Sequence, residues 1–99
     1  MALINLSIAE LSSLSGVPSD KLEENLTLLG VPVEKIDGDE ISLEITPNRP
    51  DMLCVEGVAR ALSCNTSGKP KKYEAKKSGF SLDVDKSVEE VRPSIGMAI

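Results

Sequence analysis

The stretch 44-EITPNRPDMLCVEGVARAL-62 decides how this chain folds, because a strand-like run meets a helix-like run within it. Two prolines, an asparagine, an arginine and an aspartate lie between the two runs. Pro50 biases Arg49 away from the helical region of the backbone, so the chain must turn before the helix begins. The sequence therefore predicts a sharp strand-to-helix corner over residues 46–51.

The polar side chains of this corner each have an expected structural task. The Asp51 carboxylate is expected to cap the following helix on the amide of Leu53 or Cys54. Asn48 can fold back in an Asx turn, and Arg49 has five donors for nearby carbonyls or for a carboxylate. These arguments favour a structural corner over a ligand site.

A helix is predicted from Met52 to about Ser63. Glu56 and Arg60 stand four residues apart, in the order that favours an ion pair on the outer face of a helix. Helical spacing places four apolar residues on the inner face: Val55, Val58, Ala59 and Leu62.

The two cysteines are predicted to be free thiols. Cys54 and Cys64 lie ten apart in one expected helix, which separates their Cα atoms by about 15 Å. A disulfide needs less than about 7 Å. Cys54 has no partner base in its apolar surroundings, so we expect a buried small hydrophobe rather than a nucleophile.

Two helices are predicted upstream of the corner. Residues 1–6 form an apolar run that fits a buried strand, and Ser7 with Glu10 has the spacing of a capping box. The first helix carries the apolar stripe Ile8, Leu11 and Leu14 and ends at Gly16. The second helix starts at 18-PSD-20, carries Leu22, Leu26 and Leu29 on one face, and ends at Gly30.

A β-hairpin is predicted between the second helix and the corner. Ile41, Leu43 and Ile45 alternate with polar residues, and Asp37-Gly38 marks a turn after the strand-like residues 33–36. The register stays open. A two-residue Asp-Gly turn places Lys35 opposite Glu40, whereas a four-residue loop pairs Ile36 with Ile41 and leaves Glu34 beside Leu43.

The chain is predicted to have three parts: a module over 1–66, a basic linker over 67–79, and the truncated start of a further domain over 80–99. The linker belongs to an exposed connection that is rich in Gly, Ser and Lys. Residues 80–85 alternate like a strand, Ser87 with Glu90 could cap one turn, and the apolar run 94–99 is typical of a core strand in a cut chain.

Composition limits the function classes. Residues 1–64 hold eleven acidic and four basic side chains, which argues against a nucleic-acid groove on this part. The chain has no histidine, so catalytic groups built on His are excluded and a structural zinc site has too few ligands. An independent small hydrolase finds no nucleophile–base pair. No segment has the roughly 20 apolar residues that span a bilayer, and we expect a cytosolic protein.

A lysine cluster is the feature that favours nucleic acid. The segment 68-GKPKK-72 lacks the upstream glycine and the Ser or Thr of a phosphate loop, so a solvated linker is the simpler interpretation. A free-standing nucleic-acid-binding module remains the alternative function. Its RNA contacts would be five lysines: Lys69, Lys71, Lys72, Lys76 and Lys77.

The corner stretch also resembles a family pattern. It is similar to the N-R-P-D-x-L-x-x-E-G-x-A-R-A-L run in the N-terminal region of the phenylalanyl-tRNA synthetase β subunit. The L-G-V-P-V-E lead-in, the D-G-D-E turn and 91-VRPSIGMAI-99 resemble the archaeal and eukaryotic type, so the similarity covers essentially the whole chain. The residues on the pattern are Asn48, Arg49, Pro50, Asp51, Leu53, Glu56, Gly57, Ala59 and Arg60.

The resemblance implies more than the composition does. The family's enzyme is an assembly of two α and two β subunits that joins phenylalanine to its tRNA with ATP and magnesium. Its aminoacylation site lies in the α subunit, and its editing site lies in a later domain of the β subunit. Residues 80–99 of this chain resemble the start of that editing domain. The fragment itself would therefore hold no cofactor, metal or catalytic centre. Its partners would be the rest of the β subunit, the α subunit and tRNA, without a membrane.

We therefore expect an α+β fold, with a small, mainly antiparallel sheet packed by about three helices. The expected role is structural: an N-terminal module that offers a surface to neighbouring domains or to tRNA.

Overall fold

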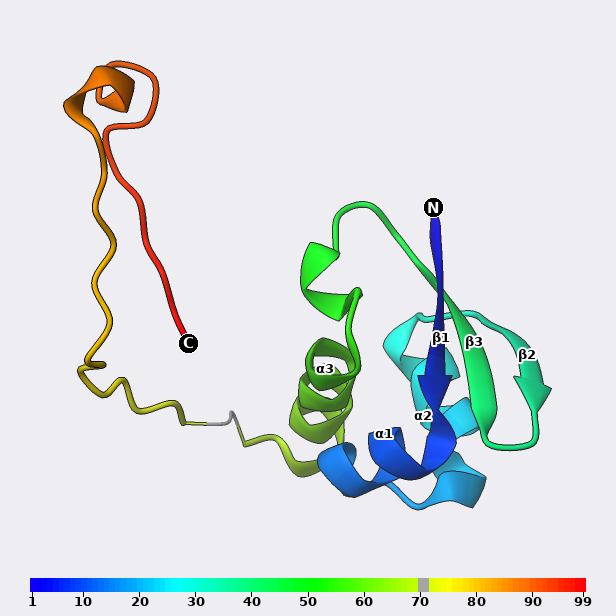
Figure 1. Ribbon diagram of the computed structural model, residues 1–99. Helices are drawn as coiled ribbons and strands as arrows, with labels where there is room; N and C mark the ends of the chain where they lie inside the picture. Colours follow the sequence, from blue (N-terminus) through cyan, green and yellow to red (C-terminus); the bar gives the residue numbers. More distant parts are fainter. Residues whose placement is uncertain (70–71) are drawn as a thin grey trace.

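The fold is α+β, as the sequence predicts (Figure 1). The structure is a computed structural model that describes residues 1–69 and 72–99. Within these residues the order of elements is β1 (Ala2–Ser7), α1 (Ile8–Ser15), the short 3₁₀ helix η1 (Ser19–Lys21), α2 (Leu22–Leu29), β2 (Val33–Asp37), β3 (Glu40–Ile45), η2 (Pro50–Met52), α3 (Val55–Ser67) and η3 (Lys86–Val88).

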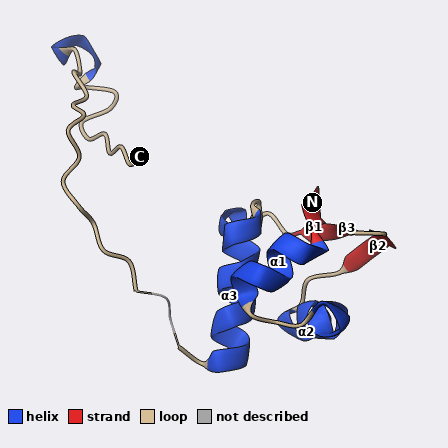
Figure 2. Ribbon diagram, turned by 60° about the horizontal axis from the view of Figure 1, so that its bottom comes forward, coloured by secondary structure: helices blue, strands red, loops and turns tan. Residues whose placement is uncertain are grey.

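The three strands form an antiparallel sheet in the order β1-β3-β2, so β3 is the central strand. Figure 2 shows the helices gathered on one side of this sheet. The alternation in β3 directs Ile41, Leu43 and Ile45 toward the helices, where all three are buried. The helices complete the core with their own fully buried side chains: Leu11, Leu22, Leu26, Val58 and Leu62.

The start of α1 and the C-terminal ends of α1 and α2 follow the sequence signals, whereas α2 begins at Leu22, after η1, and not at 18-PSD-20. The Ser7 side chain accepts a hydrogen bond from the Glu10 amide at 3.1 Å, so Ser7 is the N-cap of α1. Gly16 and Gly30 end α1 and α2 with left-handed backbone, at φ 75° and 85°. A residue with a Cβ would be strained at either position, which is why glycine ends both helices.

Two apolar predictions were wrong. Residues 1–6 do not form a buried strand, because β1 is an edge strand and Leu3 on its outer face is 62% exposed. Leu14 is 51% exposed, because it lies at the rim of the core beside Ala59 and Ser63 of α3. At the end of α1 the buried side chain is instead that of Ser15, whose hydroxyl accepts a hydrogen bond from the Val17 amide.

The hairpin takes the register in which Ile36 faces Ile41, with Asp37 opposite Glu40. The second alternative predicted this pairing of Ile36 with Ile41, but across a four-residue loop. In the structure the loop between the strands has two residues, Gly38 and Asp39. Glu34 does not lie beside Leu43, because an irregularity between Val33 and Lys35 places Val33 opposite Leu43. The bulge therefore turns an apolar side chain toward the core.

The C-terminal part departs from the sequence patterns. Helix α3 extends to Ser67 rather than Ser63, and Gly68 ends it with φ 66°. Within the described residues, 80–85 and 94–99 are not strands, since neither pairs with a neighbouring strand. The turn between them is capped by Asp85, which accepts from the Ser87 amide, and not by Ser87. The predicted division into three parts stays a prediction.

Candidate functional site

The stretch after β3 turns in two steps. The Arg49 amide donates to the Thr46 carbonyl at 3.0 Å, which closes a turn around Pro47 and Asn48. The short helix η2 then starts at Pro50, where the missing amide hydrogen costs nothing. Arg49 has φ −123° and ψ 60°, outside the helical region, as the following proline requires.

Arg49 and Asp51 form a two-pronged ion pair across the start of η2. The guanidinium Nε donates to Oδ1 and Nη2 donates to Oδ2, both at 2.9 Å. Arg60 of α3 reaches Oδ2 of the same carboxylate at 3.5 Å. The Asp51 carboxylate therefore joins the corner to α3. Both arginine side chains remain partly exposed, at 40% and 42%.

Two sequence predictions about these charges were wrong. Asp51 does not cap the following helix, because its carboxylate is bound by the two arginines instead. Arg60 pairs with Asp51 rather than with Glu56, which forms no ion pair within the described residues. The tertiary partner of Arg60 has replaced the local i, i+4 partner that helical spacing suggested.

The arginines also shift the acidity of Asp51. The hydrogen bonds from Arg49 lower the pKa of Asp51 from its usual 3.8 to about 2, and the charges of Arg49 and Arg60 act in the same direction. Partial desolvation of the carboxyl group opposes this shift. Asp51 is therefore ionised across the physiological pH range. A carboxylate in that state cannot serve as a general acid.

The helix α3 begins without a side-chain cap. Its N-cap residue is Cys54, whose carbonyl accepts from the Val58 amide at 3.2 Å. The prediction that Cys54 is buried was wrong, because the cap position places the residue outside the apolar face of the helix, where it is exposed. Cys54 and Cys64 are both free thiols, as expected from their separation.

Close backbone packing explains Gly57. A Cβ atom on Gly57 would overlap the carbonyl oxygen of Asp51, so only glycine lets α3 approach η2 this closely. The side chain of Met52, 3% exposed, anchors the same turn in the core. The sequence patterns treated Met52 as a variable position. An apolar residue within a polar corner is the signal that could have identified this anchor.

Asn48 is the corner residue with the fewest interactions. It is exposed, and its side chain makes no hydrogen bond within the described residues. The expected Asx turn is therefore absent, because the backbone bond from Arg49 to Thr46 already closes this turn. The polar residues and glycine of the motif differ accordingly. The turn, the ion pairs and close packing involve Arg49, Pro50, Asp51, Gly57 and Arg60, whereas Asn48 and Glu56 lie at the surface.

The lysine cluster lies away from the corner. Lys69, Lys72, Lys76 and Lys77 are exposed along the segment that follows α3, and Lys71 lies outside the described residues. The corner is at the other end of α3, and thirteen helical residues separate the two by about 20 Å (Figure 1). Among the described residues, the structure therefore does not combine Lys69, Lys72, Lys76 and Lys77 with Arg49 into one basic surface.

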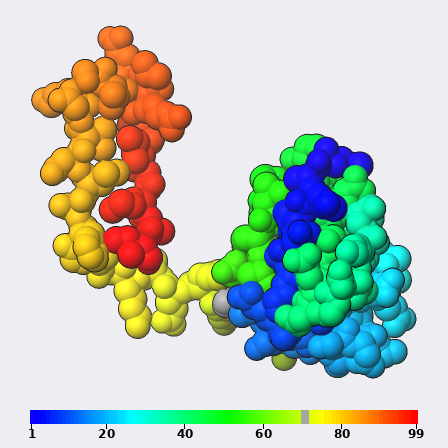
Figure 3. Space-filling view, turned by 45° about the vertical axis from the view of Figure 1, so that its right-hand side comes forward, coloured from blue at the N-terminus to red at the C-terminus, as the bar shows by residue number. Residues whose placement is uncertain are grey.

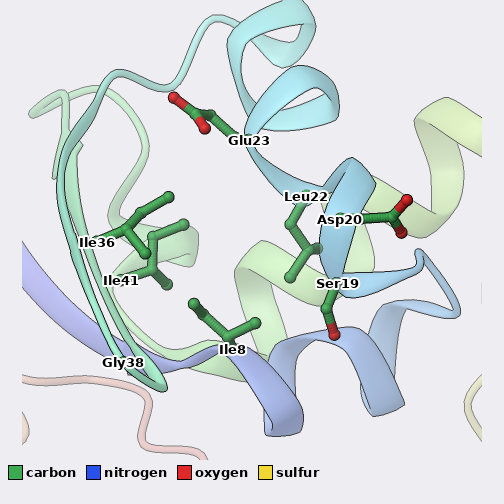
Figure 4. Close-up of a pocket in the computed structure, with 8 residues that line it drawn as sticks. All are labelled: Ile8, Ser19, Asp20, Leu22, Glu23, Ile36, Gly38 and Ile41. Atoms are coloured by element: carbon green, nitrogen blue, oxygen red, sulfur yellow. The ribbon is translucent and has the colours of Figure 1, made fainter.

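A pocket of about 410 Å³ lies between α2 and the hairpin (Figure 4). Ile8, Leu22, Ile36 and Ile41 line it, and the Asp20 carboxylate points away from them. A catalytic pocket requires polar groups that converge on one point, and the polar groups of this pocket do not. The described residues contain no group of three or more His, Cys, Asp or Glu side chains placed for a metal ion. No helix among them is long and apolar enough to cross a membrane.

The hairpin turn and the start of α1 share a polar cluster that the sequence patterns did not indicate. The Asp39 carboxylate accepts from the Ser7 hydroxyl at 2.6 Å and from the Ala9 amide at 2.9 Å. The Asp39 carbonyl also accepts from the Ile8 amide at 2.7 Å. The hairpin turn thus caps the start of α1 together with Ser7. These contacts span thirty residues or more, so no local pattern could have indicated them.

Fold and corner together define a small α+β module in which Arg49 and Arg60 both pair with Asp51. No family model matches the chain. It is 36% identical over 101 residues to the phenylalanine–tRNA ligase β subunit of Methanococcoides burtonii, covering 100% of this chain and 19% of that protein. It is 38% identical over 97 residues to the β subunit of Archaeoglobus fulgidus, covering 96% and 18%.

A solved structure shows the same fold. The chain resembles an N-terminal fragment of the phenylalanyl-tRNA synthetase β subunit from Pyrococcus horikoshii, with a TM-score of 0.73 and 24% identity. The match covers 94% of this chain and 29% of that one. This chain is therefore homologous, over its full length, to the N-terminal region of archaeal phenylalanine–tRNA ligase β subunits. It spans about a fifth of the length of these curated relatives.

Proposed function

We propose that the chain serves as the N-terminal module of a phenylalanine–tRNA ligase β subunit and that its work there is architectural. The single observation that carries this proposal is that essentially the whole chain is homologous to the N-terminal region of β subunits. Two features of the site support a role without chemistry. The charges of Arg49, Asp51 and Arg60 are directed at one another, and the pocket between α2 and the hairpin lacks converging polar groups.

In this proposal the module works in the cytoplasm, within an assembly of β and α subunits that attaches phenylalanine to tRNA. ATP and magnesium belong to other parts of that enzyme. The isolated 99-residue chain should neither charge tRNA nor release tyrosine from mischarged tRNA.

A chimeric enzyme tests the proposal. Residues 1–99 replace the matching N-terminal region of the Methanococcoides burtonii β subunit, and the chimera is produced together with the α subunit of that organism. We expect a stable complex that charges tRNA with phenylalanine. A chimera that folds but forms no complex with α, while the unmodified β subunit does, would contradict the proposal.

The rival function is nucleic-acid binding by the lysine cluster, and salt dependence separates the two. Five phosphate contacts would give a slope of about −4 when the logarithm of tRNA affinity is plotted against the logarithm of salt concentration. We expect the isolated chain to bind tRNA weakly, with a slope much nearer zero. A steep slope that is lost when Lys69, Lys71, Lys72, Lys76 and Lys77 are changed to Gln would favour the rival.

A further inference from the structure

The two edges of the sheet are built differently. β2 is protected against pairing with another strand, because its bulge falls at Glu34 and Lys35 forms an ion pair with Asp37 at 2.9 Å. Bulges and charged side chains are the usual devices that keep an edge strand from adding a neighbour. β1 has the sequence 2-ALINLS-7, without charge, proline or bulge. The β1 edge is therefore open to a further strand.

The hydrogen bonds of β3 show which β1 groups face outward. The Glu44 amide donates to the Pro32 carbonyl at 3.0 Å, so the polar backbone groups of Glu44 face the β2 side. Its partner Leu3 must then belong to a pair without hydrogen bonds between β1 and β3. By alternation, the N–H and C=O groups of Leu3 and Asn5 point to the open edge. They have no hydrogen-bond partner within the described residues.

The side chains along β1 are also incompletely covered. Ile4 and Leu6 pack against the core but remain half-buried, since no strand among residues 1–69 and 72–99 pairs with the outer edge of β1. Figure 3 shows the dark blue N-terminal strand on the surface of the folded body. At the start of β1, a hollow of about 270 Å³ is lined by residues at the start of the chain, the end of β3 and the stretch after it, among them the exposed Met1 and Leu53. An added strand would cover this apolar surface.

We propose that the β1 edge is completed by an extended segment of the β subunit that lies outside this chain. The inference rests on the proposed function. Only an extended backbone can pair with the outward N–H and C=O groups of Leu3 and Asn5. Because the β1 edge is uncharged, it favours an uncharged segment with alternating apolar side chains. About four fifths of each relative's length lies outside the matched region, so such a segment has ample chain to come from.

Tethering within one protein also favours this occupant over a second copy. A six-residue strand buries much less than the roughly 1,200–2,000 Å² of a stable interface between separate chains. A segment of the same polypeptide needs no such area, because the tether supplies a high effective concentration. The β1 edge is accordingly suited to an intramolecular strand.

Hydrogen exchange in the chimeric β subunit tests this proposal. In the isolated chain the amides of Leu3 and Asn5 should exchange fast, while those of Ile4 and Leu6 are protected by β3. In the chimera the exchange of the Leu3 and Asn5 amides should slow by about tenfold or more. Leu3→Pro removes an outward N–H and no bond to β3, so it should lower the yield of folded chimera severalfold without unfolding the isolated chain. Ile36→Pro, at the matching outward position of protected β2, is the control and should leave the yield unchanged.

The outcomes separate this proposal from the proposed function. A chimera that assembles with α while Leu3 and Asn5 still exchange fast would overturn the edge proposal and leave the function intact. An isolated chain that forms dimers lost in Leu3→Pro would identify a second copy as the occupant and overturn it as well. A chimera that fails to assemble with α contradicts the function, and with it this inference.

Discussion

Gly57 of α3 lies directly against the backbone carbonyl of Asp51, so closely that a Cβ atom at position 57 would overlap it. Alanine normally stabilises a helix interior relative to glycine, by up to about 1 kcal/mol. Here we expect the opposite sign. Gly57→Ala should lower the free energy of unfolding by about 1–3 kcal/mol, because η2 must move away from α3. Denaturant unfolding of the isolated chain measures this change.

Gly79→Ala is the matched control, since Gly79 is exposed and a Cβ there would meet no atom within 4 Å. It should change the free energy of unfolding by less than about 0.5 kcal/mol. If Gly57→Ala were as stable as the wild type, the close contact between α3 and η2 would be wrong.

The pKa of Asp51 predicts an acid limit to stability. A carboxyl group whose pKa is lowered on folding, here from 3.8 to about 2, stabilises the folded state above its unfolded value. That contribution is lost as the pH falls from about 4 to about 2. Unfolding midpoints measured across this window should fall less steeply in Asp51→Asn than in the wild type. Glu56→Gln, which removes a surface carboxylate that forms no ion pair within the described residues, is the control for the loss of one negative charge.

Asp39 should control the start of α1. Asp39→Asn weakens the charged hydrogen bonds to the Ser7 hydroxyl and the Ala9 amide, and the pKa of Asp39 is lowered by those bonds, led by the one from Ser7. We expect a lower unfolding midpoint and faster exchange of the Ala9 amide. Asp20→Asn, at an exposed carboxylate without a partner within the described residues, should change neither quantity. Unaltered exchange at Ala9 in Asp39→Asn would show that Ser7 caps the helix alone.

The core prediction compares two leucines of α2. Leu26 is fully buried, and Leu26→Ala should lower the free energy of unfolding by about 2–5 kcal/mol through lost burial and a cavity. Leu28 is 73% exposed, so Leu28→Ala should stay within about 0.5 kcal/mol of the wild type. Similar losses from both would mean that α2 packs through another face.

Local signals in the sequence predicted the elements well. Ser7, Gly16 and Gly30 act at helix ends through contacts within a few residues, so their roles follow from short-range chemistry. The alternation of Ile41, Leu43 and Ile45 predicted the buried face of β3 for the same reason.

Partners that are distant in sequence could not be predicted. The Asp39 carboxylate binds Ser7 and Ala9 across the fold, and Arg60 pairs with Asp51 because η2 folds back onto α3. The open register of the hairpin was decided by the bulge at Glu34, which no pattern in the sequence indicated. Exposure of Leu3 and Cys54 likewise depends on their places at a sheet edge and at a helix cap.

We expect Arg49 to stabilise the corner through its ion pair with Asp51 and not to bind RNA. Arg49→Gln in the isolated chain tests this expectation most directly, with the unfolding midpoint and tRNA affinity measured on the same samples. We predict a lower midpoint, modest because the ion pair is partly exposed, and unchanged tRNA affinity. An unchanged midpoint together with weaker tRNA binding would show that Arg49 belongs to an RNA site and does not stabilise the corner.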